Sequence, residues 1–262
     1  MTPGWSVASV PYFIYIAAVA MFSRDLPASS RARSAGSAVV GLALALAAAL
    51  TDVYWLRALV LPPIVLLIAY RASGFLWRGP MFGIEAKLVA ADQAFGIPTL
   101  VRRTPRIVAE LLEFAYLGVY PLIPIALALH LTYSPAPDAD LFWTVVLVTD
   151  YVCFAMLPFI QTRPPRALET ADPWSARLRG LNLRILHHAS TRMNTIPSGH
   201  AAEALAAALL VLAAPAPIVA AMFVAAAAIS VGAVLGRYHY SIDIITGWAT
   251  ALVVFAMLNA EW

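Results

Sequence analysis

The sequence predicts an all-α, polytopic bundle of membrane helices, and its composition, its hydropathy and the spacing of its apolar runs all favour this class. Of the 262 residues, 62% are hydrophobic and only 12% are charged, and the mean hydropathy is +0.80. A soluble domain carries about 25% charged residues. Too little polar surface remains to cover this chain in water, so the composition excludes an ordinary soluble domain.

Eight apolar segments are long enough, within a few residues, to cross a membrane as helices. A helix needs about 20 residues to cross a hydrocarbon core of ~30 Å. No internal repeat divides the chain, so we expect one membrane domain over 1–262. The predicted spans are 7–23, 35–52, 56–71, 107–131, 141–161, 199–214, 216–236 and 240–259.

Two polar segments separate these spans. Charged residues are too densely spaced in 72–106 for a span, which favours an interfacial amphipathic helix or a re-entrant segment. The segment 162–197 is rich in arginine, and attraction to anionic lipid headgroups is its simplest interpretation. Cys153 is the only cysteine, so no intrachain disulfide can form.

Three short motifs at the ends of predicted spans suggest a second interpretation of that basic segment. They are Gln-Thr-Arg-Pro-Pro-Arg (161–166), Pro-Ser-Gly-His (197–200) and Gly-Arg-Tyr-His-Tyr-Ser-Ile-Asp (236–243). The first leaves the fifth span, the second enters the sixth, and the third joins the seventh to the eighth. Because successive spans alternate in direction, we expect all three motifs at the same membrane face.

The second motif has the pattern of a phosphate-binding helix start. Ser198 follows a proline and precedes an alanine-rich segment, which predicts a helix N-cap. Gly199 would let a phosphate approach the free backbone N–H groups, which bind phosphate together with the helix dipole. His200 lies in the first turn of this helix, within reach of the same phosphate.

The third motif places His239 four residues before Asp243, so on a helix the two residues share one face. An aspartate in this position accepts the Nδ1 proton and leaves Nε2 free as a nucleophile. The guanidinium groups of Arg163, Arg166 and Arg237 suit the equatorial oxygens of a phosphoryl transition state. Together these residues predict phosphoryl chemistry.

The three segments resemble the signature motifs of the phosphatidic acid phosphatase type 2 superfamily. The family patterns are Lys-x6-Arg-Pro, Pro-Ser-Gly-His and Ser-Arg-x5-His-x3-Asp. Arg163-Pro164 matches the end of the first, 197–200 the whole second, and His239-x3-Asp243 the end of the third. The resemblance covers roughly 140–259. It implies a six-helix membrane core, which we place in 56–262, with accessory spans in 1–55.

The resemblance also implies a role for each matching residue. His239 attacks phosphorus and forms a phosphohistidine, Asp243 orients it, and His200 protonates the departing alcohol. The residues implied to hold phosphate oxygens are Arg163, Ser198 and Gly199. Enzymes of this kind use no metal, and we expect no cofactor.

The sequence departs from the family pattern at two expected cations. Met156 stands where the first motif has lysine, and Ala233 stands where the third has arginine. By proximity, Arg166 and Arg237 are candidates to replace them. The Arg-Tyr-His-Tyr-x-x-Asp form also resembles the branch of inositol phosphorylceramide and sphingomyelin synthases, in which an alcohol takes the phosphoryl group in place of water.

Three functions therefore stay open at this point. The first is a membrane lipid phosphatase that hydrolyses a phosphomonoester or a pyrophosphate on a lipid. The second is a lipid head-group phosphotransferase that uses the same histidine, and the third is a non-enzymatic lipid carrier that retains the fold. The expected partners are a phosphorylated lipid and the lipid bilayer, with no nucleic acid. The sequence leaves the oligomeric state open.

Acidic residues within spans are costly, and besides Asp52 at a span end and Asp243 in the third motif the predicted spans contain four. For these four we favour structural roles, although Asp150 could instead pair with an arginine or line a substrate cavity, and Glu203 lies one turn from the phosphate site. They are Glu110, Glu113, Asp150 and Glu203. We expect an integral protein of a bacterial inner membrane. Its arginine-rich face predicts a cytoplasmic site, whereas the family resemblance predicts a periplasmic or external one.

Overall fold

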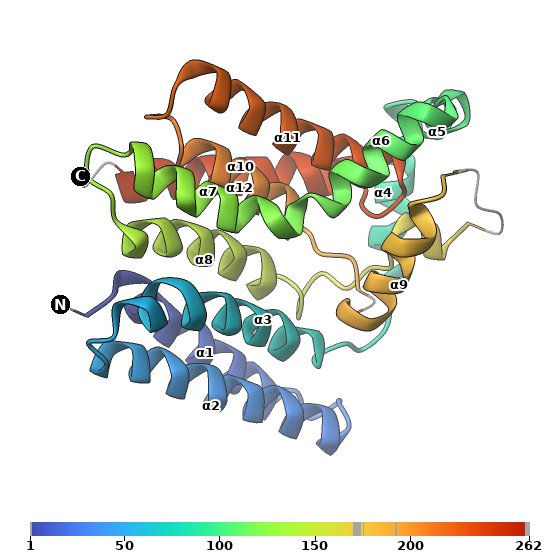
Figure 1. Cartoon of the computed structure of the whole chain (residues 1–262). Helices are drawn as coiled ribbons and strands as arrows, with labels where there is room; N and C mark the ends of the chain where they lie inside the picture. Colours follow the sequence, from blue (N-terminus) through green and yellow to red (C-terminus); the bar gives the residue numbers. More distant parts are fainter. Residues whose placement is uncertain (1, 170–173, 175, 192, 260–262) are drawn as a thin grey trace.

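A computed structural model describes residues 2–169, 174, 176–191 and 193–259, and these residues are mostly helical and form no strand. The long helices run along one common direction, and α4, α5 and α9 gather at one end of the bundle (Figure 1). In chain order the helices are α1 (Gly4–Phe22), α2 (Ala28–Leu50), α3 (Leu61–Gly74), α4 (Phe82–Ala94), α5 (Ile97–Arg103), α6 (Arg106–Leu117), α7 (Val119–Tyr133), α8 (Ala139–Ala155), α9 (Arg179–Ala189), α10 (Gly199–Leu209), α11 (Ala216–Leu235) and α12 (Ser241–Asn259).

Among the described residues, five helices are long and apolar enough to cross a membrane, which confirms the predicted all-α polytopic bundle. They are α1, α2, α11, α12 and the helix Leu56–Gly74, whose first turn is π-helical and whose remainder is α3. A sixth span forms if α6 and α7, which meet at a bend of 57°, are taken together. Pro121 and Pro124 follow this bend; because proline has no N–H to donate and its ring clashes with the preceding turn, they account for the break.

The fifth and sixth predicted spans are shorter than the sequence suggested. Helix α8 has 17 residues and ends at Ala155, three residues before Pro158, where the prediction ran to 161. Helix α10 has 11 residues and gives way to turns before Pro215. Its buried alanines let α10 pack closely against α7, α8, α11 and α12, so this short helix occupies the centre of the bundle.

The accessory helices pack directly on the rest of the bundle. Helix α1 lies between α2 and α8, and α2 also contacts α3. One apolar cluster runs through these helices and the core, from Phe13 and Ile16 of α1 to Ala206 of α10. Large apolar side chains also point outward along the long helices, as Phe22, Leu50 and others do, which suits a lipid surrounding.

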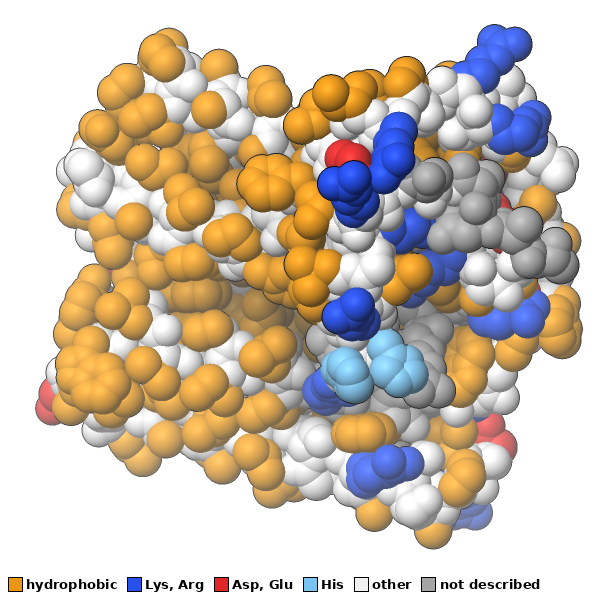
Figure 2. All heavy atoms as spheres, turned by 45° about the vertical axis from the view of Figure 1, so that its right-hand side comes forward, with side chains coloured by type: hydrophobic (Ala, Val, Ile, Leu, Met, Phe, Trp, Pro, Cys, Tyr) orange, Lys and Arg blue, Asp and Glu red, His pale blue; other side chains and the backbone are white. Residues whose placement is uncertain are grey.

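The polar segments lie at the end of the bundle where α8 ends and α10 begins (Figure 1). The segment 72–106 forms α4 and α5, and the segment 162–197 forms a single 3-10 turn (Pro165–Ala167) and α9. Residues 170–173, 175 and 192 of that second segment lie outside the described residues. Figure 2 shows basic and histidine side chains gathered at this end, while apolar side chains cover the long helices.

Candidate active site

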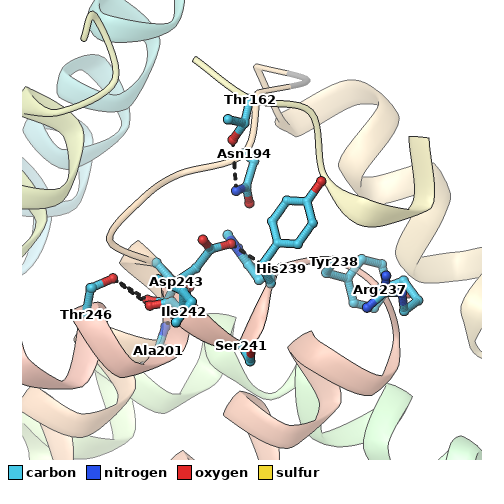
Figure 3. Close-up of polar contacts among 12 residues, drawn as sticks. Thr162, Asn194, Ala201, Arg237, Tyr238, His239, Ser241, Ile242, Asp243 and Thr246 are labelled. Carbon is cyan, nitrogen blue, oxygen red and sulfur yellow. Dashed lines mark hydrogen bonds and ion pairs between the residues drawn. The ribbon is translucent and has the colours of Figure 1, made fainter. Parts of the chain in front are cut away.

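Backbone hydrogen bonds join the three motifs at this end of the bundle. The N–H of Asn194 donates to the carbonyl of Thr162 at 2.8 Å, which ties the first motif to the approach of the second. The N–H of Ser198 donates to the carbonyl of Asp243 at 2.9 Å, and this bond ties the second motif to the third. Figure 3 shows Thr162 and Asn194 beside the His239–Asp243 pair. The predicted convergence of the motifs is therefore present.

His239 and Asp243 form a pair, but not on one helix face as the sequence suggested. Helix α12 begins only at Ser241, so His239 lies in the preceding turn. Asp243 is fully buried in the first turn of α12 and reaches back along the chain. Its Oδ2 lies 3.3 Å from His239 Nδ1 and accepts a 2.8 Å hydrogen bond from the N–H of Tyr240 (Figure 3). This reach to the preceding backbone resembles a capping box, which explains why the helix can start here.

Helix α4 fixes the start of α12 from the other side. Oδ1 of Asp92 accepts hydrogen bonds from the N–H and the hydroxyl of Ser241, at 2.9 and 2.8 Å. Oδ2 of Asp92 pairs with Arg237 at 2.7 Å. Arg237 itself has a φ of 60°, in the left-handed region, and forms a sharp turn after α11. A buried carboxylate thus holds the turn that presents His239.

At the start of α10, Ser198 is the N-cap, as predicted, and its side chain accepts a hydrogen bond from the N–H of Ala201 at 3.4 Å. Gly199 lies against α8. A Cβ at this position would be 3.1 Å from Asp150 Oδ1 and 3.2 Å from Phe154 Cε1. The absence of a side chain therefore lets α10 approach α8 closely, a reason that the sequence did not reveal.

A cavity of about 190 Å³ opens beside these residues. Gly199, His200 and His239 line it together with Arg166, so the two histidines of different motifs face one space. The ring of His200 lies near two tyrosine rings, with centroids 5.8 Å from Tyr116 and 6.1 Å from Tyr120. Two acidic residues and several apolar side chains also line the cavity, among them Asp150, Glu203, Leu66, Leu67, Val119, Phe154 and Leu186.

Of the three predicted phosphate-binding arginines, only Arg166 lines the cavity. Its guanidinium lies 5.2 Å from the centroid of the Tyr238 ring and donates a weak, 3.4 Å hydrogen bond to the Tyr238 carbonyl. Burial lowers the pKa of Arg166, since the charged form loses hydration. Among the described residues Arg166 has no ion-pair partner. Its charge is therefore available to a ligand.

Arg163 and Arg237 are instead engaged with carboxylates outside the cavity. Arg163 donates to both oxygens of buried Glu85, at 3.1 and 2.8 Å, and its backbone N–H donates to the same carboxylate at 2.7 Å. These hydrogen bonds hold the pKa of Glu85 below its usual value. Arg237 pairs with Asp92 and with Glu169, each at 2.7 Å. The phosphate-binding roles of Arg163 and Arg237 stay predictions.

Neither of the two positions that lack the expected cations lines the cavity. Met156 follows α8 and is 37% exposed. Ala233 is buried in an apolar cluster with Tyr116 and Tyr238, whose rings stack with centroids 4.2 Å apart.

The sequence analysis did not identify the carboxylates of α4 that bind Arg163 and Arg237. The available signal was the spacing of Glu85 and Asp92, seven residues apart, which places both on one face of a helix.

The comparisons with known proteins agree with the motifs. A family model described as PAP2 superfamily matches residues 86–257, well over half of the chain. No curated protein and no solved structure matches it. The resemblance to the inositol phosphorylceramide and sphingomyelin synthase branch stays a prediction. With the motifs, the helical bundle and the family match in agreement, the chain belongs to the PAP2 superfamily.

Proposed function

We propose that the chain is an integral membrane lipid phosphatase that hydrolyses a phosphomonoester or a pyrophosphate on a lipid through a phosphohistidine at His239. Membership of the PAP2 superfamily supports a phosphatase-type enzyme. The observation that carries the proposal is that His239, which pairs with Asp243, lines one cavity with His200 and Arg166. The apolar outer faces of the spans keep the site beside the lipid that it acts on.

In the proposed first step, Nε2 of His239 attacks phosphorus and the P–O bond to the lipid breaks. The carboxylate of Asp243 accepts the hydrogen bond of Nδ1–H, so that Nε2 is the unprotonated nitrogen. His200 donates a proton to the departing oxygen. In the second step a water attacks the phosphohistidine, gives a proton to His200, and releases inorganic phosphate.

The charge of the transferred phosphoryl group would be stabilised by Arg166 and by the start of α10. Backbone N–H groups in the first turn of a helix are unpaired and bind phosphate oxygens together with the helix dipole. A guanidinium donates paired hydrogen bonds in a fixed fork, which suits two oxygens of one phosphate. Neither a metal nor a cofactor takes part in the proposed reaction.

The proposal is tested by phosphate release in detergent micelles, with phosphatidic acid and a prenyl diphosphate as substrates. We expect His239→Ala and His200→Ala to lose release by at least about a hundredfold while folding is retained. The matched control is His187→Ala, an exposed histidine on α9. Acid-labile, base-stable phosphate on the quenched wild-type protein, absent from His239→Ala, would identify the intermediate. Release by folded His239→Ala at the wild-type rate would overturn the proposal.

A head-group phosphotransferase is the second candidate, and the burial of His239 favours it. His239 is only 8% exposed, and much of the cavity wall is apolar, which restricts the access of water to a phosphohistidine. Product analysis with and without an added lipid alcohol separates the two reactions. A new phosphate ester formed faster than inorganic phosphate would favour transfer. The third candidate, a non-enzymatic lipid carrier that retains the fold, predicts that His239→Ala leaves lipid transport in cells intact.

A further inference from the structure

The cavity has an acidic side that the proposed reaction does not use. Asp150 comes from α8 and Glu203 from α10, and both line the cavity. Asp150 is 1% exposed, and its Oδ2 has no hydrogen-bond partner among the described residues. The two carboxyl groups lie close enough to interact electrostatically. A buried carboxyl group with an unpartnered oxygen is costly in either protonation state, so this arrangement points to a ligand that satisfies it.

Aromatic rings surround the two carboxyl groups. Phe154 lies beside Asp150, since both approach Gly199, and its ring centroid is 5.3 Å from that of Tyr70. Tyr120 also lines the cavity and interacts electrostatically with Glu203. Carboxylates attract a cation, and the faces of aromatic rings stabilise one through their quadrupoles. This combination suits an ammonium group better than a neutral polyol.

A guanidinium and two carboxyl groups line the same small cavity without pairing with each other. Arg166 carries the positive charge, and neither Asp150 nor Glu203 forms an ion pair within the part of the chain that the structure describes. A ligand that has both a phosphate and an ammonium group would satisfy Arg166 and the carboxylates together. A second phosphate, by contrast, would meet like charge at the acidic side.

We propose that Asp150 and Glu203 form a subsite for an ammonium group in the alcohol part of the phosphate ester, so that the substrate is the phosphate of an amino alcohol carried on a lipid. The inference rests on the proposed function, because it takes the phosphate to lie at His239 and Arg166. It also excludes prenyl diphosphates as preferred substrates, since a prenyl diphosphate has no amine and its second phosphate adds negative charge.

The test compares two single-chain C18 lipid phosphates in the same detergent micelles. Sphinganine 1-phosphate carries an amine beside the phosphate ester, and 1-oleoyl lysophosphatidic acid carries a hydroxyl. We expect wild-type kcat/KM to favour the amine at least about tenfold. In the double variant Asp150→Asn/Glu203→Gln we expect this ratio to fall towards one. The matched control is Glu110→Gln on α6, whose carboxylate does not line the cavity and which should keep the wild-type ratio.

Each outcome decides between the inference and the proposed function. Equal wild-type kcat/KM for the two lipids would overturn the ammonium subsite and leave the phosphatase proposal standing. If neither lipid releases phosphate, the phosphatase proposal fails with these substrates, and binding then tests the subsite. Greater thermal stabilisation of the wild-type protein by phosphoethanolamine than by glycerol 1-phosphate would support the subsite, and equal stabilisation would overturn it. The same binding assay applies if the double variant does not fold.

Discussion

Replacement of each motif arginine by alanine separates phosphate binding from structural support. Arg166 lines the cavity and has no ion-pair partner among the described residues, so its loss removes charge from the reacting phosphate. One preorganised donor to a developing negative charge contributes about 10²–10³ in rate, or ~2.7–4 kcal/mol. We expect Arg166→Ala to lower kcat/KM by about that factor with little change in the thermal unfolding midpoint.

Arg237→Ala should have the reverse effect. Arg237 is 5% exposed and neutralises Asp92, which is buried at 1% exposure. Removal of one partner from a buried ion pair costs about 3–5 kcal/mol, because the other charge stays buried without compensation. The expected result is a large fall in the unfolding midpoint, and a loss of activity that follows the loss of folded protein.

The assay is phosphate release per folded protein, measured in micelles beside the thermal unfolding of the same samples. Arg163→Ala is the third member of the series, and we expect it to resemble Arg237→Ala because Glu85 holds the guanidinium. If folded Arg163→Ala instead lost kcat/KM as strongly as Arg166→Ala, the assignment of phosphate binding by cavity position would be refuted. The role that the resemblance implies for Arg163 would then stand.

Three further predictions concern the nucleophile, acid stability and orientation. Asp243→Asn should lower kcat by about 10²–10⁴, since His239 loses the carboxylate that selects its tautomer; phosphate release in the folded variant checks this. Arg163 depresses the pKa of Glu85 in the folded protein. The stability that this pair adds is therefore present above about pH 4.3, the pKa of an unfolded glutamate, and is lost as the pH falls through the lower, folded-state pKa. The unfolding midpoints of wild type and Glu85→Gln should converge at acid pH. The arginine distribution predicts that Arg103→Cys resists an impermeant maleimide in intact cells, whereas the family resemblance predicts labelling there, so the labelling decides between the two faces.

The motifs could be placed from sequence because their positions follow from chain direction alone. Spans that alternate in direction return every second end to the same face, and the convergence of 161–166, 197–200 and 236–243 requires nothing more. The pairing of His239 with Asp243 was predicted from local spacing, because residues four apart are neighbours in a helical turn. The prediction was wrong only in placing both residues on one helix, because α12 begins at Ser241, after His239.

The roles of the arginines could not be predicted in this way. Whether a guanidinium is free depends on carboxylates that lie about 80 to 145 residues away in the sequence, as Glu85 does from Arg163 and Asp92 from Arg237. Hydropathy placed α4 at the membrane interface but gave no direction for its acidic side chains. For Asp150 the sequence favoured a structural role, with an arginine pair or a place in the cavity wall as alternatives, and the structure places Asp150 in the cavity wall.

Gly199→Ala distinguishes two reasons for the glycine in the second motif. The sequence suggested that Gly199 gives phosphate access to backbone N–H groups, whereas the structure shows close packing against Asp150 and Phe154 of α8. An added Cβ 3.1–3.2 Å from these side chains requires a shift of a few tenths of an ångström. Because overpacking costs about 1–3 kcal/mol, the packing reason predicts a lower unfolding midpoint for Gly199→Ala.

The access reason alone predicts a raised KM with an unchanged midpoint, since a methyl group would then obstruct only the ligand. Gly180→Ala is the matched control, because a Cβ there meets no other atom within 4 Å. A lower midpoint together with a changed preference between amine and hydroxyl lipids would indicate that α8 had moved and displaced Asp150. A midpoint equal to that of Gly180→Ala would refute the packing reason, and with it the view that the short α10 needs this glycine to lie against α8.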